Sequence, residues 1–255
     1  MTALLDVPSF LASYRRARKR LLLLDYDGTL VDFYDHPDDA APPMELLALL
    51  AALSSLENNS VLLLSGRKRI DLERWFGSLP GLWLAAEHGA LMRPAGSIQW
   101  NPLRPDFSRA SLEPLRPALE RFVGRAPGSF IEAKEFSLVW HYRKVAEPLG
   151  DSLAHELLAL LEGMLAGTQL RALPGSRIVE VRPAWLNKGA AVERFLELCG
   201  PAEFQLALGD DRTDEDLFRA LDSSSWTIHV GSGPSLARFA LATPADVVEV
   251  LRCLV

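Results

Sequence analysis

Three short runs of aliphatic residues along the chain are each followed at once by small or acidic residues. The runs are residues 21–24, 61–64 and 206–208. Because every position in them is apolar, both faces of each predicted strand are expected to be buried, as in a parallel sheet. Each run is also followed by a helix-like segment, so strands and helices are expected to alternate. The pattern therefore predicts an α/β fold built on an open parallel sheet.

The segments between and after these runs support the same fold. Residues 44–56 are rich in Leu and Ala, which favour helices, and residues 68–76 follow the second run in the same way. Residues 82–86 and 227–230 predict two further strands. Near the end, Thr243 as N-cap, Pro244 at the first helical position and Asp246 in the first turn predict a helix over 245–254.

The middle of the chain has a different pattern. Prolines interrupt it at positions 94, 102, 105, 114, 117 and 127. In segment 130–143, Leu138, Trp140 and Tyr142 alternate with other residues, which predicts a half-buried strand. A helix over 149–165 and a strand over 178–181 are expected to follow. We interpret this region as a small α+β domain inserted at residues 105–183, which divides the core into residues 1–104 and 184–255.

Composition and charge exclude several classes of protein. The chain has 255 residues, 49% of them hydrophobic, and 27 Lys and Arg against 33 Asp and Glu, a formal charge of −6. This balance is typical of a folded protein and argues against a nucleic-acid partner, which normally binds a basic surface. We interpret the one dense basic run, residues 15–20, as a solvated segment that leads into the first strand.

The chain is also expected to be soluble and cytoplasmic. Its longest nearly unbroken apolar run, residues 46–53, is far shorter than the roughly 20 residues that span a bilayer, so no membrane association is expected. The N-terminal residues lack the order of a secretory signal, because apolar residues precede the basic ones. Cys199 and Cys253 are widely separated and predict neither a disulfide framework nor a zinc site.

Each aliphatic run ends in polar residues that can perform chemistry. Asp25-Tyr26-Asp27-Gly28-Thr29 follows the first run, Ser65-Gly66-Arg67 the second, and Gly209-Asp210-Asp211-Arg212-Thr213-Asp214-Glu215 the third. Ligands of open α/β sheets bind at the carboxyl ends of the strands, so these three segments are expected to converge on one site.

Asp25 and Asp27 are candidates for a catalytic carboxylate pair. If the strand continues through Asp25, the two side chains lean to the same side. One carboxylate can then act as a nucleophile while the other transfers a proton. Gly28 lets the backbone turn sharply and approach a ligand. The alternative is a plain turn, in which Asp and Gly are common anyway.

The acidic cluster after the third run is a candidate cation site. Asp214 and Glu215 suit the first turn of a helix, where carboxylates meet the positive end of the helix dipole. That explanation does not cover Asp210 and Asp211, which come directly after a buried strand. Together with Asp25 and Asp27 they form an oxygen-rich set of the kind that hard cations such as Mg²⁺ prefer.

Phosphate is the ligand that the remaining polar residues suit. The hydroxyl of Ser65 and the backbone N–H of Gly66 could hold phosphoryl oxygens, and Lys188 at a predicted helix start could supply positive charge. Taken alone, Lys188 would be a surface lysine. No nucleotide-binding loop, His-Glu-x-x-His or Gly-x-Ser-x-Gly motif is present.

These motifs in this order resemble those of the haloacid dehalogenase (HAD) superfamily of aspartate-nucleophile phosphatases. The set is Asp25-Tyr26-Asp27-Gly28-Thr29-Leu30, Ser65-Gly66-Arg67, Asn187-Lys188-Gly189 and Gly209-Asp210-Asp211-x-Thr213-Asp214-Glu215. Within the superfamily the chain is similar to the trehalose-6-phosphate phosphatases, especially the phosphatase half of fused synthase–phosphatase proteins. Supporting stretches include Leu84-Ala85-Ala86-Glu87-His88-Gly89 and Val179-Glu180-Val181-Arg182-Pro183. The resemblance covers nearly everything after residue 20 and implies a HAD-like Rossmannoid core with an inserted α+β cap of the C2 type.

The resemblance also implies a division of roles. Asp25 would attack phosphorus, and Asp27 would protonate the leaving sugar oxygen and then activate water. Ser65 and Lys188 would bind the phosphoryl group, with Gly66 and Arg67 also contacting substrate. Mg²⁺ would be held by Asp25, the main-chain carbonyl of Asp27 and Asp210, with Asp211 and Asp214 in support.

In the predicted cap, Glu132, Lys134 and Glu180 are the expected sugar-binding residues. Carboxylates can accept hydrogen bonds from sugar hydroxyls, and an ammonium can donate one. The alternative is an ordinary exposed strand face. His141 and Arg143 share one face of their strand and are weaker candidates, and His88 belongs to the family pattern without a clear role.

Three functions remain open at this point. The first is Mg²⁺-dependent hydrolysis of trehalose 6-phosphate through an aspartyl-phosphate. The second is a related capped phosphatase that acts on sucrose phosphate or mannosyl-3-phosphoglycerate. The third is a non-catalytic sugar-phosphate-binding module that partners a trehalose-6-phosphate synthase.

Overall fold

The computed structural model describes residues 3–34 and 39–255. The chain divides into two compact units, which we call the core unit, Met1–Leu103 with Asn187–Val255, and the inserted unit, Arg104–Leu186. We expected an insertion over residues 105–183. That the inserted unit acts as a separate domain stays a prediction.

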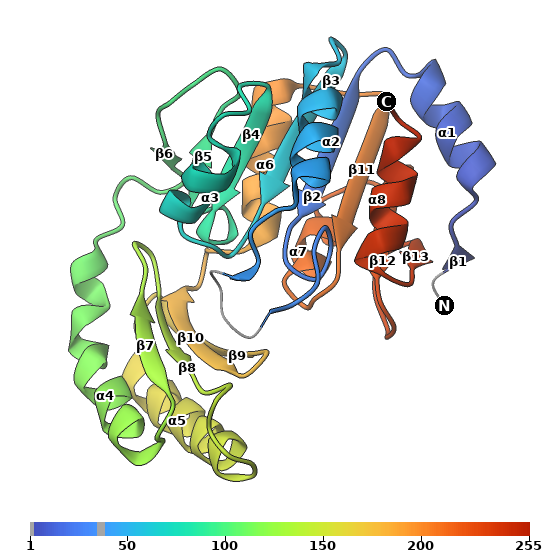
Figure 1. Ribbon diagram of the computed structural model, residues 1–255. Helices are drawn as coiled ribbons and strands as arrows, with labels where there is room; N and C mark the ends of the chain where they lie inside the picture. Colours follow the sequence, from blue (N-terminus) through green and yellow to red (C-terminus); the bar gives the residue numbers. More distant parts are fainter. Residues whose placement is uncertain (1–2, 35–38) are drawn as a thin grey trace. The chain divides into compact units, whose positions relative to one another are not determined.

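A nine-stranded sheet forms the centre of the core unit (Figure 1). Its order is β1 (Ala3–Leu4), β13 (Phe239–Leu241), β12 (Trp226–Val230), β11 (Phe204–Gly209), β2 (Arg20–Asp25), β3 (Asn59–Leu64), β4 (Leu82–Ala86), β5 (Leu91–Arg93) and β6 (Asn101–Pro102). Neighbours pair in parallel from β1 through β4, and β5 and β6 are antiparallel. The predicted α/β class with a parallel sheet is therefore confirmed.

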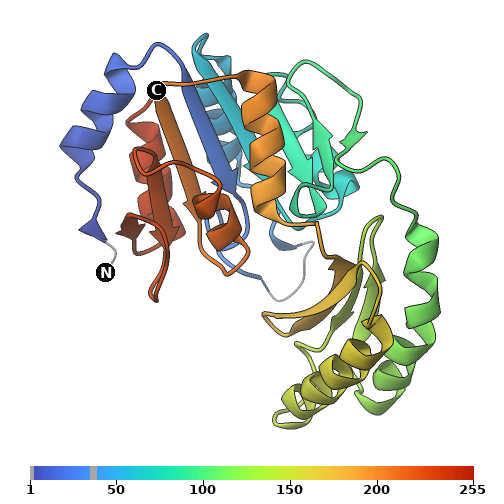
Figure 2. The ribbon, with the colours of Figure 1, turned by 180° about the vertical axis from the view of Figure 1, so that it is seen from behind.

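Helices cover both faces of this sheet. In Figure 1, α2 (Met44–Ser55), α3 (Arg69–Phe76) and α8 (Pro244–Arg252) lie in front of it, whereas α6 (Lys188–Cys199) and α7 (Asp214–Arg219) lie behind and come forward in Figure 2. Leu21 and Leu23 of β2 belong to the apolar cluster that includes Phe195 of α6. The alternate residues, Leu22 and Leu24, are also completely buried. Burial on both faces explains the unbroken aliphatic runs.

The strand order creates a topological switch point at the carboxyl end of β2. β2 lies between β11 and β3, so the chain proceeds to opposite sides of β2. In open α/β sheets the crevice at the carboxyl ends of such strands is the usual ligand site. The polar segments that follow β2, β3 and β11 all begin there.

The inserted unit is built on a four-stranded antiparallel sheet. Its order is β7 (Phe130–Ala133), β8 (Leu138–His141), β10 (Ile178–Pro183) and β9 (Leu170–Gly175). The helices α4 (Arg116–Arg125) and α5 (Leu149–Leu165) pack against one face through Leu138, Trp140, Val179 and Val181. This second, separate sheet matches the expected α+β cap.

Two local expectations differ from the structure. Segment 130–143 is a hairpin of β7 and β8 rather than a single strand, because residues 134–137 form its turn. The basic run is not simply a solvated lead-in: it spans the end of α1 (Val7–Arg16) and the start of β2. There the guanidinium of Arg20 lies 4.4 Å from the ring centroid of Tyr14 and donates to the Tyr14 carbonyl.

The closing helix follows its predicted signals. The Thr243 side chain accepts from the Asp246 backbone, and the Asp246 side chain accepts from the Thr243 backbone, which forms a capping box. Across residues 3–34 and 39–255, every helix is too short or too polar to cross a bilayer.

Candidate active site

Two of the predicted carboxylates of the core unit, Asp25 and Asp214, contact Lys188. This residue begins α6, which is capped by Asn187: the Asn187 side chain accepts from the Ala190 N–H at 2.9 Å. The ammonium of Lys188 donates to Asp25 Oδ1 at 2.6 Å and to Asp214 Oδ1 at 2.7 Å. All three side chains are buried. Lys188 is therefore not the surface lysine that its sequence context alone suggests.

Asp214 also fixes the loop that follows β11. Its second oxygen, Oδ2, accepts from the backbone N–H of Asp210 at 3.2 Å and of Asp211 at 3.1 Å. The carboxylate thus links the Lys188 ammonium to the loop that carries the other two aspartates. Asp214 therefore holds Lys188 and this loop in place and also contributes negative charge to the site.

Three carboxylates come close enough to share one cation. Single oxygens of Asp25, Asp210 and Asp214 lie within 4.8 Å of one another. Asp27 and Asp211, which were also expected near the cation, are outside this group. Asp211 is exposed, and its Oδ1 accepts from the backbone and hydroxyl of Thr213 at 2.8 and 2.7 Å.

The electrostatics of this group favour a bound cation. Burial raises the pKa of Asp25 to about 7 against the effect of Lys188, and the charges of Asp210 and Asp211 add to the rise. Burial and the neighbouring Asp211 and Asp214 likewise raise the pKa of Asp210 to about 7. Carboxyls crowded in this way ionise readily only when positive charge is supplied.

One atom of Asp25 points to the same conclusion. Its Oδ2 is buried and has no hydrogen-bond partner within residues 3–34 and 39–255. A buried carboxylate oxygen without a partner is costly, so it is expected to have a ligand in the working protein. The all-oxygen set of Asp25, Asp210 and Asp214 suits a hard divalent cation. The residues present therefore fit a metal site.

Lys188 keeps its charge in these surroundings. Burial alone would lower the pKa of its ammonium, but the carboxylates of Asp214 and Asp25 outweigh burial and raise it. Lys188 and the hydrogen bonds from Thr213 hold the pKa of Asp211 at about 2, below its usual value. A phosphoryl group bound here would meet a permanent positive charge.

Gly28 allows the loop after β2 to approach Asp210. Its φ of 85° lies in the left-handed region, and a Cβ built on it would lie 2.3 Å from Asp210 Oδ2. The next residue, Thr29, donates its hydroxyl to Asp210 Oδ1 at 3.2 Å. Only glycine has both the conformation and the space for this approach.

Replacing Gly28 should therefore damage the site more than the fold. We expect Gly28→Ala to lower turnover by at least about 10-fold, because displacement of Asp210 misplaces a candidate metal-binding oxygen. Gly96→Ala is the matched control: Gly96 also has a positive φ, 74°, but nothing lies within 4 Å of its added Cβ. Both variants should lose about 1 kcal/mol of stability in denaturant titrations. Equal turnover in the two would contradict the packing argument.

Asp27 lies just after β2, which ends at Asp25, and forms an isolated bridge with Val31. Both of its carboxylate oxygens accept from Arg67, from NH2 at 2.6 Å and from Nε at 2.8 Å. The Arg67 guanidinium in turn lies 4.7 Å from the ring centroid of Trp75. This bidentate pair joins the first and second motifs, and no spacing in the sequence could have predicted it.

The Ser65-Gly66-Arg67 segment leaves β3 beside the Glu87-His88-Gly89 turn that follows β4. Ser65 is buried, and its hydroxyl accepts from the Arg67 N–H at 3.2 Å. The His88 N–H donates to the Ser65 carbonyl at 2.9 Å, and a Cβ on Gly66 would lie 2.7 Å from the His88 ring. Glu87 and His88 both have positive φ, 50° and 57°. Their strained turn holds His88 against the second motif, a contact that the family pattern alone did not explain.

The predicted sugar-binding residues belong to the inserted unit. Glu132 and Glu180 both pair in register with Val139, from β7 and β10 on either side of β8, so they share one face of the sheet. Glu132 Oε2 lies 3.0 Å from His141 Nε2 and 4.0 Å from the Lys134 ammonium. Glu180 Oε2 accepts from Arg182 at 3.3 Å. Trp140 is buried on the opposite face, as expected, and Tyr142 is buried just beyond the end of β8.

Comparison with known proteins agrees with the geometry. A sequence model of the trehalose-phosphatase family matches residues 23–244. The bifunctional trehalose-6-phosphate synthase/phosphatase of Thermoproteus tenax is 40% identical over 238 residues, which cover 92% of this chain and 32% of that protein. The chain thus spans about a third of the length of such curated relatives.

Solved structures give the same result. The C-terminal domain of Candida albicans trehalose-6-phosphate phosphatase is 33% identical with a TM-score of 0.92, and the match covers 100% of this chain and 98% of that one. A haloacid dehalogenase-like hydrolase from Bacteroides thetaiotaomicron, 13% identical with a TM-score of 0.66 over 93% of this chain and 100% of that one, shares the fold. This chain belongs to the trehalose-phosphatase family, within the HAD fold.

Proposed function

We propose that this chain hydrolyses trehalose 6-phosphate to trehalose and phosphate. The observation that carries the proposal is the state of Asp25. One of its oxygens is bound by Lys188, and the other is buried without a partner in the described part of the chain. Such a carboxylate is oriented by one oxygen and can use the other as a nucleophile. Membership of the family supports the choice of substrate.

The first chemical step uses Asp25 and Asp27. Asp25 Oδ2 attacks phosphorus, and an aspartyl-phosphate forms while the bond from phosphorus to the sugar oxygen breaks. Asp27 gives its proton to that oxygen, so the sugar leaves as an alcohol. Both Asp27 oxygens accept from Arg67 in this structure, so the guanidinium orients the carboxyl. Arg67 thereby holds Asp27 in position.

The second step reverses the role of Asp27. As a carboxylate it takes a proton from water, the hydroxide attacks phosphorus, and Asp25 leaves as a free carboxylate. Throughout, the Lys188 ammonium, the Ser65 hydroxyl and the Gly66 N–H bind phosphoryl oxygens. Mg²⁺, bound by Asp25, the Asp27 carbonyl and Asp210 and supported by Asp211 and Asp214, would neutralise phosphoryl charge when present.

Residues of the inserted unit would select the sugar. We assign Glu132, Lys134 and Glu180 to the hydroxyl groups of trehalose, since together they offer hydrogen-bond acceptors and a donor on one sheet face. In this proposal the inserted unit, Arg104–Leu186, is a cap that closes over the substrate and excludes water. Arg67 would also face the substrate.

A substrate panel tests the proposal directly. Purified protein with Mg²⁺ is assayed for phosphate release from trehalose 6-phosphate, sucrose phosphate and mannosyl-3-phosphoglycerate. We expect trehalose 6-phosphate to have the highest kcat/KM. Preference for either other substrate would reassign the enzyme within the capped phosphatases, and binding of trehalose 6-phosphate without turnover would indicate a non-catalytic module.

The partner and compartment are also proposals. Because related chains carry a synthase and a phosphatase in one protein, we propose that a trehalose-6-phosphate synthase supplies the substrate and associates with this chain. Free Cys199 and Cys253 are consistent with a reducing, cytoplasmic compartment.

Mg²⁺ should stabilise the protein more at alkaline than at acidic pH. Asp25 and Asp210 have folded pKa values of about 7 against 3.8 for a free carboxyl, so without metal they favour the folded state at low pH and lose that contribution as pH rises to 7. Mg²⁺ must displace these protons below pH 7 and need not above it. We therefore expect the Mg²⁺-induced rise in Tm to be larger at pH 8 than at pH 6.

Thermal unfolding with Mg²⁺ or EDTA at the two pH values checks this expectation. Asp210→Asn should remove most of the Mg²⁺ effect, whereas Asp216→Asn, which changes a carboxylate paired with Arg219 on α7, should leave it intact. Phosphate release should stop in excess EDTA and return with Mg²⁺. An equal Tm shift at both pH values would contradict the assigned ligands.

A further inference from the structure

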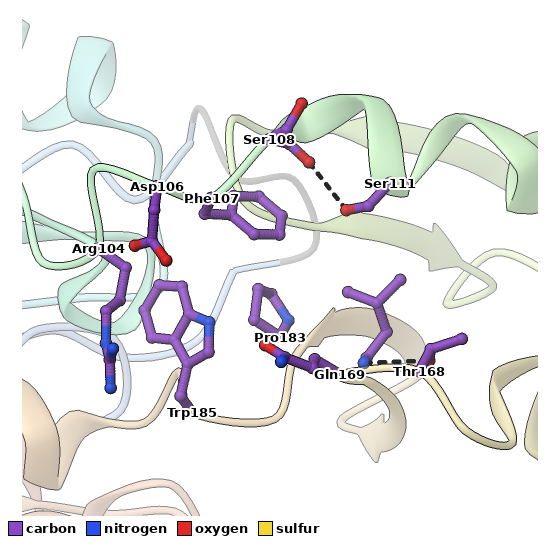
Figure 3. Close-up of a pocket in the computed structure, with 10 residues that line it drawn as sticks. Arg104, Asp106, Phe107, Ser108, Ser111, Thr168, Gln169, Pro183 and Trp185 are labelled. Carbon is purple, nitrogen blue, oxygen red and sulfur yellow. Dashed lines mark hydrogen bonds between the residues drawn. The ribbon is translucent and has the colours of Figure 1, made fainter.

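The inserted unit contains a cavity of about 580 Å³ next to both of its connections to the core unit (Figure 3). Arg104, Asp106, Phe107 and Ser108 line it directly after the chain enters the unit at Arg104. Pro183 and Trp185 line it just before the chain leaves at Leu186. The volume lies in the range of about 300–1,000 Å³ that is typical of small-molecule sites.

Aromatic rings form one wall of the cavity. The rings of Phe107 and Trp185 meet edge to face, with centroids 6.1 Å apart. Both also contact the buried Phe136, at 5.2 Å from Phe107 and 6.2 Å from Trp185. Phe136 thus supports the two rings, while Phe107 and Trp185 remain partly exposed. A rigid, partly exposed aromatic wall is suited to a flat apolar surface of a ligand.

The rest of the lining consists of the apolar Leu170 and Pro183 and of polar side chains that are balanced in charge. It contains three hydroxyls (Ser108, Ser111 and Thr168), the amide of Gln169, one cation (Arg104) and one carboxylate (Asp106). The Ser111 hydroxyl donates to the Ser108 carbonyl at 2.8 Å, and the Thr168 hydroxyl accepts from the Leu170 N–H at 3.2 Å, so both are held in place (Figure 3). Such a set offers many hydrogen bonds without net charge.

We propose that this cavity binds a neutral mono- or disaccharide. A pyranose ring has an apolar C–H face that packs on an aromatic ring, and hydroxyls around its edge that both donate and accept hydrogen bonds. The cavity presents the matching features, a wall of Phe107 and Trp185 and a rim of hydroxyls, amide and one ion of each sign. A phosphorylated sugar fits less well, because Asp106 balances the charge of Arg104.

The site is separate from the sugar-binding residues of the proposed active site. Its lining includes neither Glu132, Lys134 nor Glu180. A saccharide here would contact both segments through which the chain enters and leaves the inserted unit. The inference does not depend on the proposed reaction, since it concerns binding of a neutral sugar alone.

Calorimetry and saturation-transfer NMR with trehalose, maltose and glucose 6-phosphate test the inference on the intact chain. We expect at least one of the neutral sugars to bind with a Kd of about 10 mM or tighter, and glucose 6-phosphate to compete poorly. Gln169→Ala and Trp185→Leu should each weaken binding by about 5-fold or more. Gln99→Ala, an exposed glutamine in the core unit, should leave it unchanged.

A second set of variants separates this cavity from the proposed active site. Neutral-sugar binding should persist in a Glu132→Gln, Glu180→Gln double variant. The inference is overturned if neither disaccharide binds, or if binding is lost in the double variant and kept in Gln169→Ala. If Trp185→Leu fails to fold, the exposed Gln169 decides the result. The substrate panel reports on the reaction independently of both outcomes.

Discussion

Asp25→Asn is expected to lower phosphate release from trehalose 6-phosphate by at least about 1,000-fold. The amide keeps the shape of the carboxylate, and its oxygen can still accept from Lys188. It cannot act as the nucleophile, because an uncharged amide oxygen does not form the acyl phosphate. Steady-state phosphate assays measure the loss.

The variant should fold at least as well as the parent protein. Without metal, burial raises the pKa of Asp25 to about 7, so at pH 8 the charge on this side chain opposes folding. Asn removes that charge, and Lys188 keeps its hydrogen bond to Asp214. Denaturant titration in EDTA at pH 8 should therefore give an unfolding free energy equal to or above that of the parent.

Two further measurements make the result specific. Acid quenching during turnover should trap the parent as a phosphorylated protein of higher mass, and Asp25→Asn should show no such species. Asp216→Asn is the matched control, because this carboxylate pairs with Arg219 at 2.7 Å on α7, and its turnover should stay within about two-fold. Turnover of Asp25→Asn within about 10-fold of the parent would assign the nucleophile elsewhere.

The position of the site could be predicted from the sequence, for a reason that applies to open parallel sheets in general. Aliphatic runs with both faces buried identify parallel strands, and polar residues that follow them lie at the carboxyl edge where ligands bind. That argument needed no knowledge of long-range contacts. It brought the segments after β2, β3 and β11 to one place, as the structure does.

The partners of individual side chains could not be predicted in this way. Lys188 and Asp25 are 163 positions apart in sequence, and the Asp27–Arg67 pair spans 40, so no local spacing encodes either contact. Resemblance to a family suggested a role for Lys188 but did not describe its bond to Asp214. The position of His88 against Gly66 depends on two non-glycine residues with positive φ, which propensity does not predict.

Some elements were missed for local reasons. β9 contains Arg171, Pro174 and Gly175, so it lacks the aliphatic pattern of a strand and is stabilised by pairing with β10. In α4, Pro117 lies in the first turn, where proline is tolerated, although the surrounding prolines suggested irregular structure. Tertiary pairing in the first case and proline position in the second decided the outcome.

Lys188→Met should reduce both stability and turnover, and the size of the stability loss should depend on pH. Removing the ammonium leaves Asp25 and Asp214 buried without the cation that lies between them. Breaking a buried ion pair by removing one partner costs about 3–5 kcal/mol. The phosphoryl group would also lose a positive charge, and we expect turnover to fall by at least about 100-fold.

The pH dependence follows from the protonation of the stranded carboxyls. Lys188 works against the rise that burial causes in the pKa of Asp25, so the pKa of this carboxyl must rise further in the variant. At pH 5 the carboxyl can stay protonated at little cost, whereas at pH 8 the folded state must hold a proton that the unfolded state releases. The loss of unfolding free energy, measured by urea titration, should therefore be larger at pH 8 than at pH 5.

A double variant distinguishes a stranded charge from a loss of packing. Adding Asp214→Asn to Lys188→Met removes one of the two carboxylates. At pH 8 the double variant should therefore lose less unfolding free energy than the two single variants lose in sum. Lys144→Met replaces an exposed lysine and should change stability by less than about 0.5 kcal/mol. If Lys188→Met were as stable as the parent at pH 8, the buried ammonium could not be what holds Asp25 and Asp214 together, and the alignment of the nucleophile would need another source.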